Sequence, residues 1–92
     1  MEKVFYPEVK RIVLSTDGRI RVGRYTIGEW SKEYCEGTSH FRPSPYEGMT
    51  IYIAYLNNGS HVRSFHKNEL RYEIAGACAE GIAGEIDNES QN

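Results

Sequence analysis

The sequence predicts a small α+β domain, built mostly of antiparallel sheet from two β-hairpins, with one or two short helices. Its 92 residues suit a single modest core. Two stretches of alternating sequence are each divided by turn residues, which is the pattern of a hairpin. Apolar residues at helical spacing occur in two further segments. We therefore expect one globular domain over residues 1–86 and an acidic, disordered tail over residues 87–92.

The first hairpin is expected near the N-terminus. Residues 9–14 (VKRIVL) have the composition of a strand, and Asp17 and Gly18 supply a tight reversal into a second arm over residues 19–27.

The second arm of this hairpin carries a basic face. Strand alternation places Ile20 and Val22 on one side, and Arg19 and Arg21 on the other, with Arg24 close behind. Such a run of charge is typical of a solvated face that protects a sheet edge. The alternative is a small basic patch that binds RNA, DNA or an acidic protein surface.

The next segment, TIGEWSKEYC, is compatible with two structures. Thr26 and Glu29 have the spacing of a capping box, and Trp30 and Tyr34 continue a helical pattern. Against a helix, Gly28 would lie in its first turn. The same residues could instead extend the preceding strand, with Trp30 and Tyr34 on one face, so both forms stay open.

A loop is expected over residues 38–48 (TSHFRPSPYEG). Pro43 and Pro45 each remove a backbone donor and restrict the residue before them. Exposed aromatic and basic groups in a loop more often bind than catalyse, so His40 and Arg42 are candidate contacts with a partner.

The second hairpin, IYIAYLNNGSHVRSF at residues 51–65, has the clearest turn signal. Asn58 and Gly59 fit a two-residue type I′ turn, in which both central residues have positive φ. Such a turn fixes the register and pairs Tyr55 with Val62.

This register divides the second hairpin into two faces. The predicted core face carries Ile51, Ile53, Tyr55 and Val62. The opposite face carries Tyr52, Ala54, Leu56, His61, Arg63 and Phe65. On that second face, Tyr52 and Phe65 either stack as a buried cross-strand pair or, with Arg63, form an exposed platform for bases and phosphates. A surface that binds protein is the third possibility.

The C-terminal third predicts one more strand and one helix. In KNELRYEI, the alternation of Leu70, Tyr72 and Ile74 predicts a short third strand. Beyond it, a docked helix is expected from apolar residues at four-residue spacing, although glycines interrupt the segment. These apolar residues are Ile74, Cys78, Ile82 and Ile86.

Charge and composition exclude several classes of protein. All eleven Lys and Arg lie before residue 72, against nine acids before residue 80, so residues 1–79 carry about +2 while the whole chain carries −2. That is far from the bias of a general DNA binder. The N-terminus, MEKVFYPEVK, has no apolar signal region, and no apolar run approaches the length of a membrane span. We expect a cytoplasmic protein with no membrane partner.

The sequence offers little catalytic chemistry. Cys35 and His40 lie close in sequence, but His61 and His66 are five apart on one predicted strand and would point to opposite faces. The glycines form neither GxGxxG nor GxxxxGK. We therefore predict no enzyme, no metal, no cofactor and no small-molecule substrate.

As a whole, from MEKVFYPEVK through IYIAYLNNGSHVRSF to EIDNESQN, the chain resembles small phage-encoded anti-CRISPR proteins, in particular inhibitors of type I-F systems. The resemblance implies a host-cell cytoplasmic protein that binds the crRNA-guided surveillance complex and blocks target DNA recognition. DNA-mimic inhibitors are acidic over their folded surface, whereas residues 1–79 here carry about +2. Contacts with both Cas proteins and guide RNA are therefore expected.

A second interpretation is a small SH3-like barrel that binds nucleic acid directly. It is favoured by the ending NGSHVRSFHKNELRYEI, where a hairpin leads into a predicted final strand. Under either interpretation the candidate partner-binding residues are the same. They are Arg19, Arg21, Arg24, His40, Arg42, Tyr52, His61, Arg63 and Phe65.

Overall fold

A computed structural model describes residues 3–34 and 48–86 of the chain. Within these ranges it contains one α-helix, one 3-10 helix and seven strands, which confirms the predicted small α+β fold of mostly antiparallel sheet. In chain order the elements are β1 (Lys3–Phe5), η1 (Val9–Arg11), β2 (Ile12–Leu14), β3 (Arg19–Val22), β4 (Tyr25–Tyr34), β5 (Thr50–Leu56), β6 (His61–Ser64), α1 (Lys67–Ala77) and β7 (Ile82–Ile86). The predictions for His40, Arg42, Cys35 and the tail lie outside the described residues.

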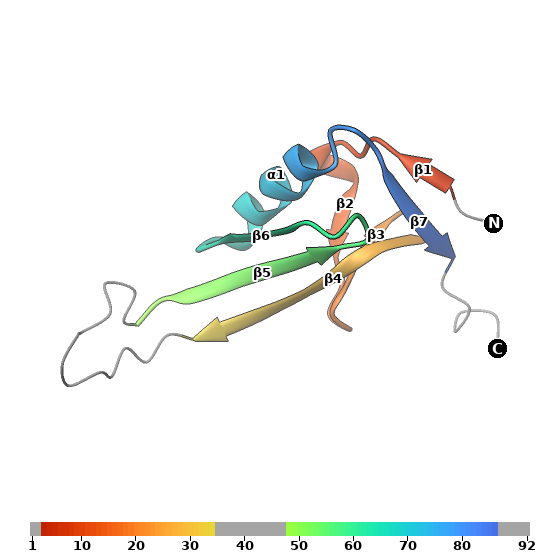
Figure 1. Cartoon of the computed structure of the whole chain (residues 1–92). Helices are drawn as coiled ribbons and strands as arrows, with labels where there is room; N and C mark the ends of the chain where they lie inside the picture. Colours follow the sequence, from red (N-terminus) through yellow and green to blue (C-terminus); the bar gives the residue numbers. More distant parts are fainter. Residues whose placement is uncertain (1–2, 35–47, 87–92) are drawn as a thin grey trace.

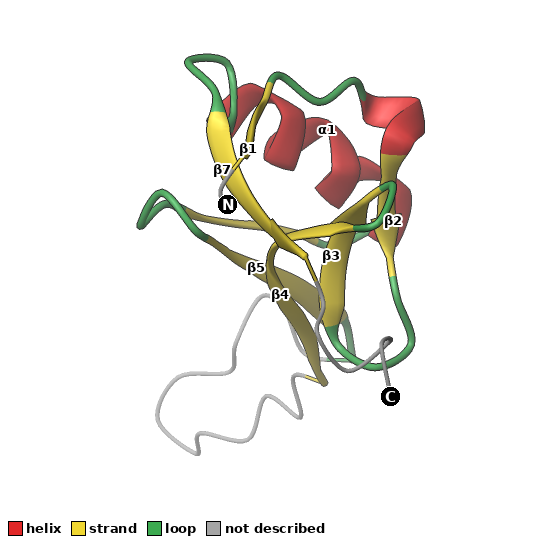
Figure 2. Ribbon diagram, turned by 90° about the vertical axis from the view of Figure 1, so that its right-hand side faces the viewer, coloured by secondary structure: helices red, strands yellow, loops and turns green. Residues whose placement is uncertain are grey.

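Strand β4 is the centre of one curled antiparallel sheet (Figure 1). Along one edge it pairs with β3. The other edge is shared: β7 pairs with Tyr25 and Thr26, and β5 pairs with residues 28–34. Two strands distant in sequence therefore meet end to end along β4. The full strand order is β1-β7-β4-β3-β2, with β5 and β6 continuing from β4. Figure 2 shows α1 lying across the open side of this curl.

The first hairpin forms as predicted between β2 and β3, but its arms are shorter. Residues Val9–Arg11 form a 3-10 turn rather than strand, in which Arg11 N donates to Glu8 O at 2.9 Å. The second arm ends at Val22, because Gly23 has φ of 63° and turns the chain back into β4. The predicted strand over residues 19–27 is thus two strands, with Arg24 in the turn between them.

The ambiguous segment after this turn is a strand, β4, rather than a helix. Gly28 explains why it fits between two neighbours. A Cβ atom there would contact the carbonyl oxygen of Tyr55 and lie 3.0 Å from the Cα of Leu56. Because glycine has no side chain, β5 can approach β4 closely at this point.

The predicted register of the second hairpin is wrong by one residue. The structure pairs Tyr55 with His61 and Ala54 with Val62. The connection is a three-residue loop, closed by a hydrogen bond of 2.9 Å from Leu56 N to Ser60 O, rather than a two-residue turn. A shift of one residue exchanges the faces of β5 and β6 relative to each other, so Val62 shares a face with Ala54 rather than with Tyr55.

Local and distant hydrogen bonds both hold the three-residue loop. Gly59 has φ of 86°, and no non-glycine residue of the described chain has positive φ, which excludes a type I′ turn at Asn58. Instead the Asn58 side-chain oxygen accepts from Ser60 N at 2.8 Å. Its Nδ2 donates to Ala77 O at the end of α1, at 3.1 Å. This is a three-residue hairpin loop with glycine in the left-handed region.

The buried face of β5 is therefore the reverse of the prediction. Ala54 and Leu56 are buried, whereas Tyr55 is 56% exposed. Tyr52 and Val62 are partly buried and pack against the same core. We call this the inner face, and of the four predicted core residues Val62 alone lies on it.

Helix α1 replaces the predicted third strand. Leu70 and Ile74 are fully buried and Cys78 follows at the same spacing, whereas Tyr72 is 66% exposed. The alternation of residues 70, 72 and 74 was compatible with both periods, and burial of every fourth residue decides for a helix. Burial also raises the pKa of the Cys78 thiol.

The predicted C-terminal helix over residues 74–86 is only partly correct: residues 74–77 form the end of α1, whereas Ile82–Ile86 form strand β7. Gly81, with φ of 95°, ends the helical region, and β7 then pairs with β1 and β4. At Gly84 an added Cβ would lie 2.7 Å from the ring of Phe5, so this position needs glycine. No described helix has the length and apolar character needed to cross a membrane. The buried core comprises Ile12, Leu14, Ile20, Val22, Ile27, Ala54, Leu56, Leu70, Ile74, Cys78 and Ile82.

Candidate functional site

The side of the β5–β6 hairpin turned away from α1 is the candidate site. Strand pairing brings its side chains into rows across the sheet. Glu29, Tyr55 and His61 form one row. Ser31, Ile53 and Arg63 form the next. We call this surface the outer face and define it by Ile51, Ile53, Tyr55, His61, Arg63 and Phe65.

The centre of the outer face combines aromatic and basic groups. The rings of Tyr55 and His61 lie 6.3 Å apart and are inclined by 31°. Both residues and Arg63 are exposed. Among the described residues no partner is found for the Arg63 guanidinium. An aromatic pair beside an available cation can contact either a protein or a nucleic acid.

A hollow of about 280 Å³ lies at one end of the outer face. Ile51, Arg63, Ser64 and Phe65 line it. The Ser64 hydroxyl donates to Glu69 Oε2 at 3.2 Å, which joins the end of β6 to the first turn of α1. The lining of the hollow therefore combines apolar side chains, the Arg63 cation and a serine whose side chain is fixed by its hydrogen bond to α1.

Tyr52 does not belong to this surface. Its ring stacks on Trp30 at 6.4 Å, and Lys67 Nζ lies 4.8 Å from the centre of the Trp30 ring. Trp30 is itself anchored by a hydrogen bond of 2.7 Å from Nε1 to Ser15 O. The predicted platform of Tyr52, Arg63 and Phe65 is therefore wrong as a group, because the true register places Tyr52 on the inner face.

The predicted arginine patch on β3 is partly neutralised. Asp17 accepts from Arg21 Nη2 at 2.9 Å and from the backbone N–H of Arg19 at 3.1 Å. The hydrogen bond from Arg21 is the main cause of a lowered pKa for the Asp17 carboxyl. Arg19 also lies opposite Glu29 in the register of β3 and β4. Arg24 lies apart from both, in the β3–β4 turn.

The sequence prediction missed Tyr55, Ile51 and Ile53 as outer-face residues. It placed them in the core because it took the loop to be two residues long. One signal could have corrected this. Ala54 and Leu56 alternate with Tyr55, and the smaller side chains suit the face on which a helix packs.

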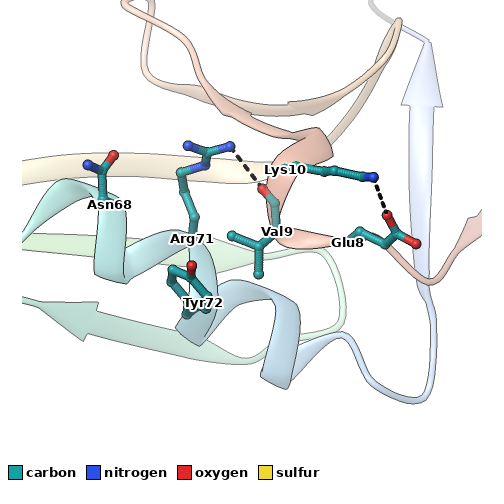
Figure 3. A pocket seen from close by; sticks show the side chains of 6 residues that line it. All are labelled: Glu8, Val9, Lys10, Asn68, Arg71 and Tyr72. Carbon is teal, nitrogen blue, oxygen red and sulfur yellow. Dashed lines mark hydrogen bonds and ion pairs between the residues drawn. The ribbon is translucent and has the colours of Figure 1, made fainter.

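A second hollow, of about 540 Å³, lies between η1 and α1 (Figure 3). Arg71 donates to Val9 O at 3.0 Å, and Lys10 pairs with Glu8 at 3.7 Å. Arg71 Nη2 and Lys10 are thus engaged within the chain, whereas the buried Arg71 Nε has no hydrogen-bond partner among the described residues. We assign Arg71 a structural role, in which it fastens η1 to the helix.

The comparisons with known proteins find no relative. No family model, curated protein or solved structure matches the chain. Within residues 3–34 and 48–86, no three or more His, Cys, Asp or Glu side chains are grouped to hold a metal ion. Function is therefore inferred from the surface of the fold.

Proposed function

We propose that this protein is a stoichiometric inhibitor of a type I-F crRNA-guided surveillance complex, and that it blocks target DNA recognition by covering a surface of the complex. The observation that carries the proposal is the outer face, where Tyr55, His61 and Arg63 are exposed together beside half-buried isoleucines. The identity of the partner comes from the resemblance of the whole chain to small phage-encoded anti-CRISPR proteins.

The outer face has the composition of a binding surface. Tyrosine and arginine are enriched among the residues that contribute most to protein interfaces. Tyr55 offers a broad ring, and Ile53 beside it is half-buried. The apolar centre can therefore be desolvated on binding, while Arg63 and His61 supply polar contacts at its border.

The charge of this face favours a partner that contains protein as well as RNA. Glu29 lies in the row of Tyr55 and His61, and Glu33 pairs across the sheet with Ile51. Both glutamates are exposed. Carboxylates among the cations weaken attraction to a bare phosphate backbone, whereas a protein surface can match both signs. Guide RNA would be contacted by Arg63 within a larger protein interface.

Direct binding of nucleic acid by a small barrel-like module is the second candidate. The curled sheet and the exposed pair of Tyr55 and His61 favour it. It requires an affinity for free RNA or DNA that falls steeply with salt, because phosphate contacts release counterions.

The test uses a purified type I-F complex loaded with crRNA. Co-elution of the two proteins and a shift assay with target DNA measure association and inhibition. Arg63→Glu is expected to weaken association by at least about tenfold, because an unpaired carboxylate would enter the interface. Lys32→Glu is the matched control, since Lys32 is an exposed β4 residue that pairs with Tyr52 and lies off the outer face.

Thermal unfolding of both variants shows whether the fold is intact. No association of the unmodified protein at micromolar concentration would exclude the inhibitor. Binding to naked RNA with a steep salt dependence would establish the second candidate instead.

A further inference from the structure

A third hollow, of about 470 Å³, lies where the β1–η1 connection meets the β3–β4 turn. It is separate from the outer face, because none of its lining residues belongs to β5 or β6. Its volume is within the range of about 300–1,000 Å³ that is usual for small-molecule sites. Its lining includes Phe5, Tyr6, Pro7, Arg11, Arg24 and Tyr25.

The aromatic walls of this hollow lie close against glycines. The rings of Phe5 and Tyr25 lie 4.9 Å apart, and a Cβ at Gly84 would come within 3.0 Å of both side chains. The Tyr6 ring lies similarly close to Gly81, where an added Cβ would lie 3.2 Å from the ring. Tyr6 nevertheless remains 69% exposed. An exposed ring is available for stacking.

The two cations of the hollow are available for a ligand. Arg11 and Arg24 are exposed, and neither guanidinium has a hydrogen-bond or ion-pair partner among the described residues. No described acidic residue lines the hollow. This distinguishes it from the hollow between η1 and α1, where Lys10 is paired with Glu8. Two unpaired guanidinium groups beside apolar walls favour a ligand with an anionic group.

We propose that this hollow binds a nucleotide, with its phosphate between Arg11 and Arg24 and its base stacked on Tyr6. A phosphate accepts the planar donor pattern of guanidinium groups, and an exposed aromatic ring stacks on any base. The nucleotide is either a free mononucleotide or the phosphorylated end of an RNA strand. The residues involved do not include the outer face, so this site and the proposed inhibitor surface can fail independently.

Calorimetric titration of the intact protein with AMP, adenosine and inorganic phosphate tests the proposal. AMP is expected to bind at least about tenfold more tightly than either fragment, because it alone engages the ring and both cations. Arg11→Gln and Arg24→Gln should each weaken AMP binding by about tenfold. Tyr6→Phe should retain binding, whereas Tyr6→Ala should lose about fivefold or more.

Arg63→Gln is the control, because it removes an exposed arginine of the outer face and should leave AMP binding unchanged. Unfolding curves of every variant separate lost binding from lost structure. The source of the nucleotide is distinguished by an RNA oligonucleotide with and without a 5′-phosphate. Tighter binding of the phosphorylated oligonucleotide than of AMP assigns the site to an RNA end, and equal binding assigns it to a free nucleotide.

Three results would overturn the proposal. The first is the absence of saturable AMP binding at millimolar concentration. The second is AMP binding that persists in a double variant carrying both Arg11→Gln and Arg24→Gln. The third is displacement of AMP by an equal concentration of a glutamate-rich peptide, which would show that the hollow accepts protein carboxylates.

Discussion

The inner and outer faces of the β5–β6 hairpin differ less in residue type than in what lies against them. The inner face presents Ala54, Leu56 and Val62 to α1, which packs on both strands. The outer face presents Ile53 and Tyr55, with no described helix over it. Both faces carry apolar residues, so hydrophobicity alone does not separate core from surface. The small inner residue Ala54 leaves room for a helix, and the larger outer residues leave a surface suited to a partner.

The largest expected loss of stability comes from a substitution in α1, the helix that packs against the inner face. Leu70→Ala should lower the free energy of unfolding by about 2–5 kcal/mol, because it removes a fully buried side chain of α1. Tyr72→Ala, on the exposed side of the same helix, should change it by about 0.5 kcal/mol or less. Urea denaturation measures both. Similar losses from the two variants would mean that α1 does not pack as described.

The next largest loss of stability is expected at Asn57, whose side chain links β4 to β7. Asn57 Nδ2 donates to Thr26 O at 3.2 Å and to Ala83 O at 2.9 Å, so it links β5 to β4 and β7. Asn57→Ala should cost about 1–2 kcal/mol, because these carbonyl groups lose a shared donor. Relative to the unmodified protein, amide hydrogen exchange in this variant should accelerate more in β7 than in β6.

The control for this variant is the neighbouring Asn58→Asp. It retains an oxygen to accept from Ser60 N and loses only the bond to Ala77 O. A larger loss from Asn58→Asp than from Asn57→Ala would contradict the role assigned to Asn57.

A smaller effect tests the register directly. Val62→Ala should lower the free energy of unfolding by about 1 kcal/mol, because Val62 packs against the core. Arg63→Ala should change it by about 0.5 kcal/mol or less, because Arg63 is exposed. Chemical denaturation of the two variants gives the comparison. The opposite order would favour the two-residue turn, in which β6 is shifted by one residue.

The smallest effect is electrostatic and lies on the first hairpin. Because hydrogen bonding to Arg21 lowers the pKa of Asp17 below its ordinary value of 3.8, the charged carboxylate stabilises the folded state. That contribution is present above about pH 4 and is lost as the pH falls through the lowered value. Melting temperatures of Asp17→Asn and the unmodified protein should therefore differ slightly at pH 7 and converge in acid. A constant difference across this range would exclude the ion pair as its cause.

The fold class and the first turn were predictable because their signals are local. Asp17 and Gly18 lie beside the strands that they connect, and the burial of Ile20 and Val22 follows from simple alternation. Tertiary packing decides that residues 26–34 form a strand rather than a helix. The clearest sign in the sequence is Gly28, whose missing side chain makes room for β5.

The hairpin register was not predictable from its turn residues alone, because the contacts that fix the loop are distant in sequence. Asn57 N donates to Ile27 O at 2.9 Å, and the Asn58 side chain reaches the end of α1. These bonds favour a three-residue loop over the type I′ turn that Asn58 and Gly59 indicate by themselves. The assignment of Tyr55 to the core face and of Tyr52 to the opposite face followed from that one error.

The hollow with Arg11 and Arg24 could not have been inferred from sequence spacing. Its walls come from β1, η1 and the β3–β4 turn, which the curl of the sheet brings together. Arg24 was predicted as a partner-binding residue, but in company with Arg19 and Arg21. The turn at Gly23 separates it from them.

Strand β6 has a further consequence for behaviour in concentrated solution. Of the described strands it pairs with β5 alone, so its other edge is available for strand addition. The strand is four residues long and includes His61 and Arg63, and both its short length and the charge of Arg63 oppose edge-to-edge stacking of copies. Replacing these two residues with valine would turn the same edge into a nucleus for aggregation. The Arg63 cation that we propose to meet a partner therefore also opposes association of free copies through this edge.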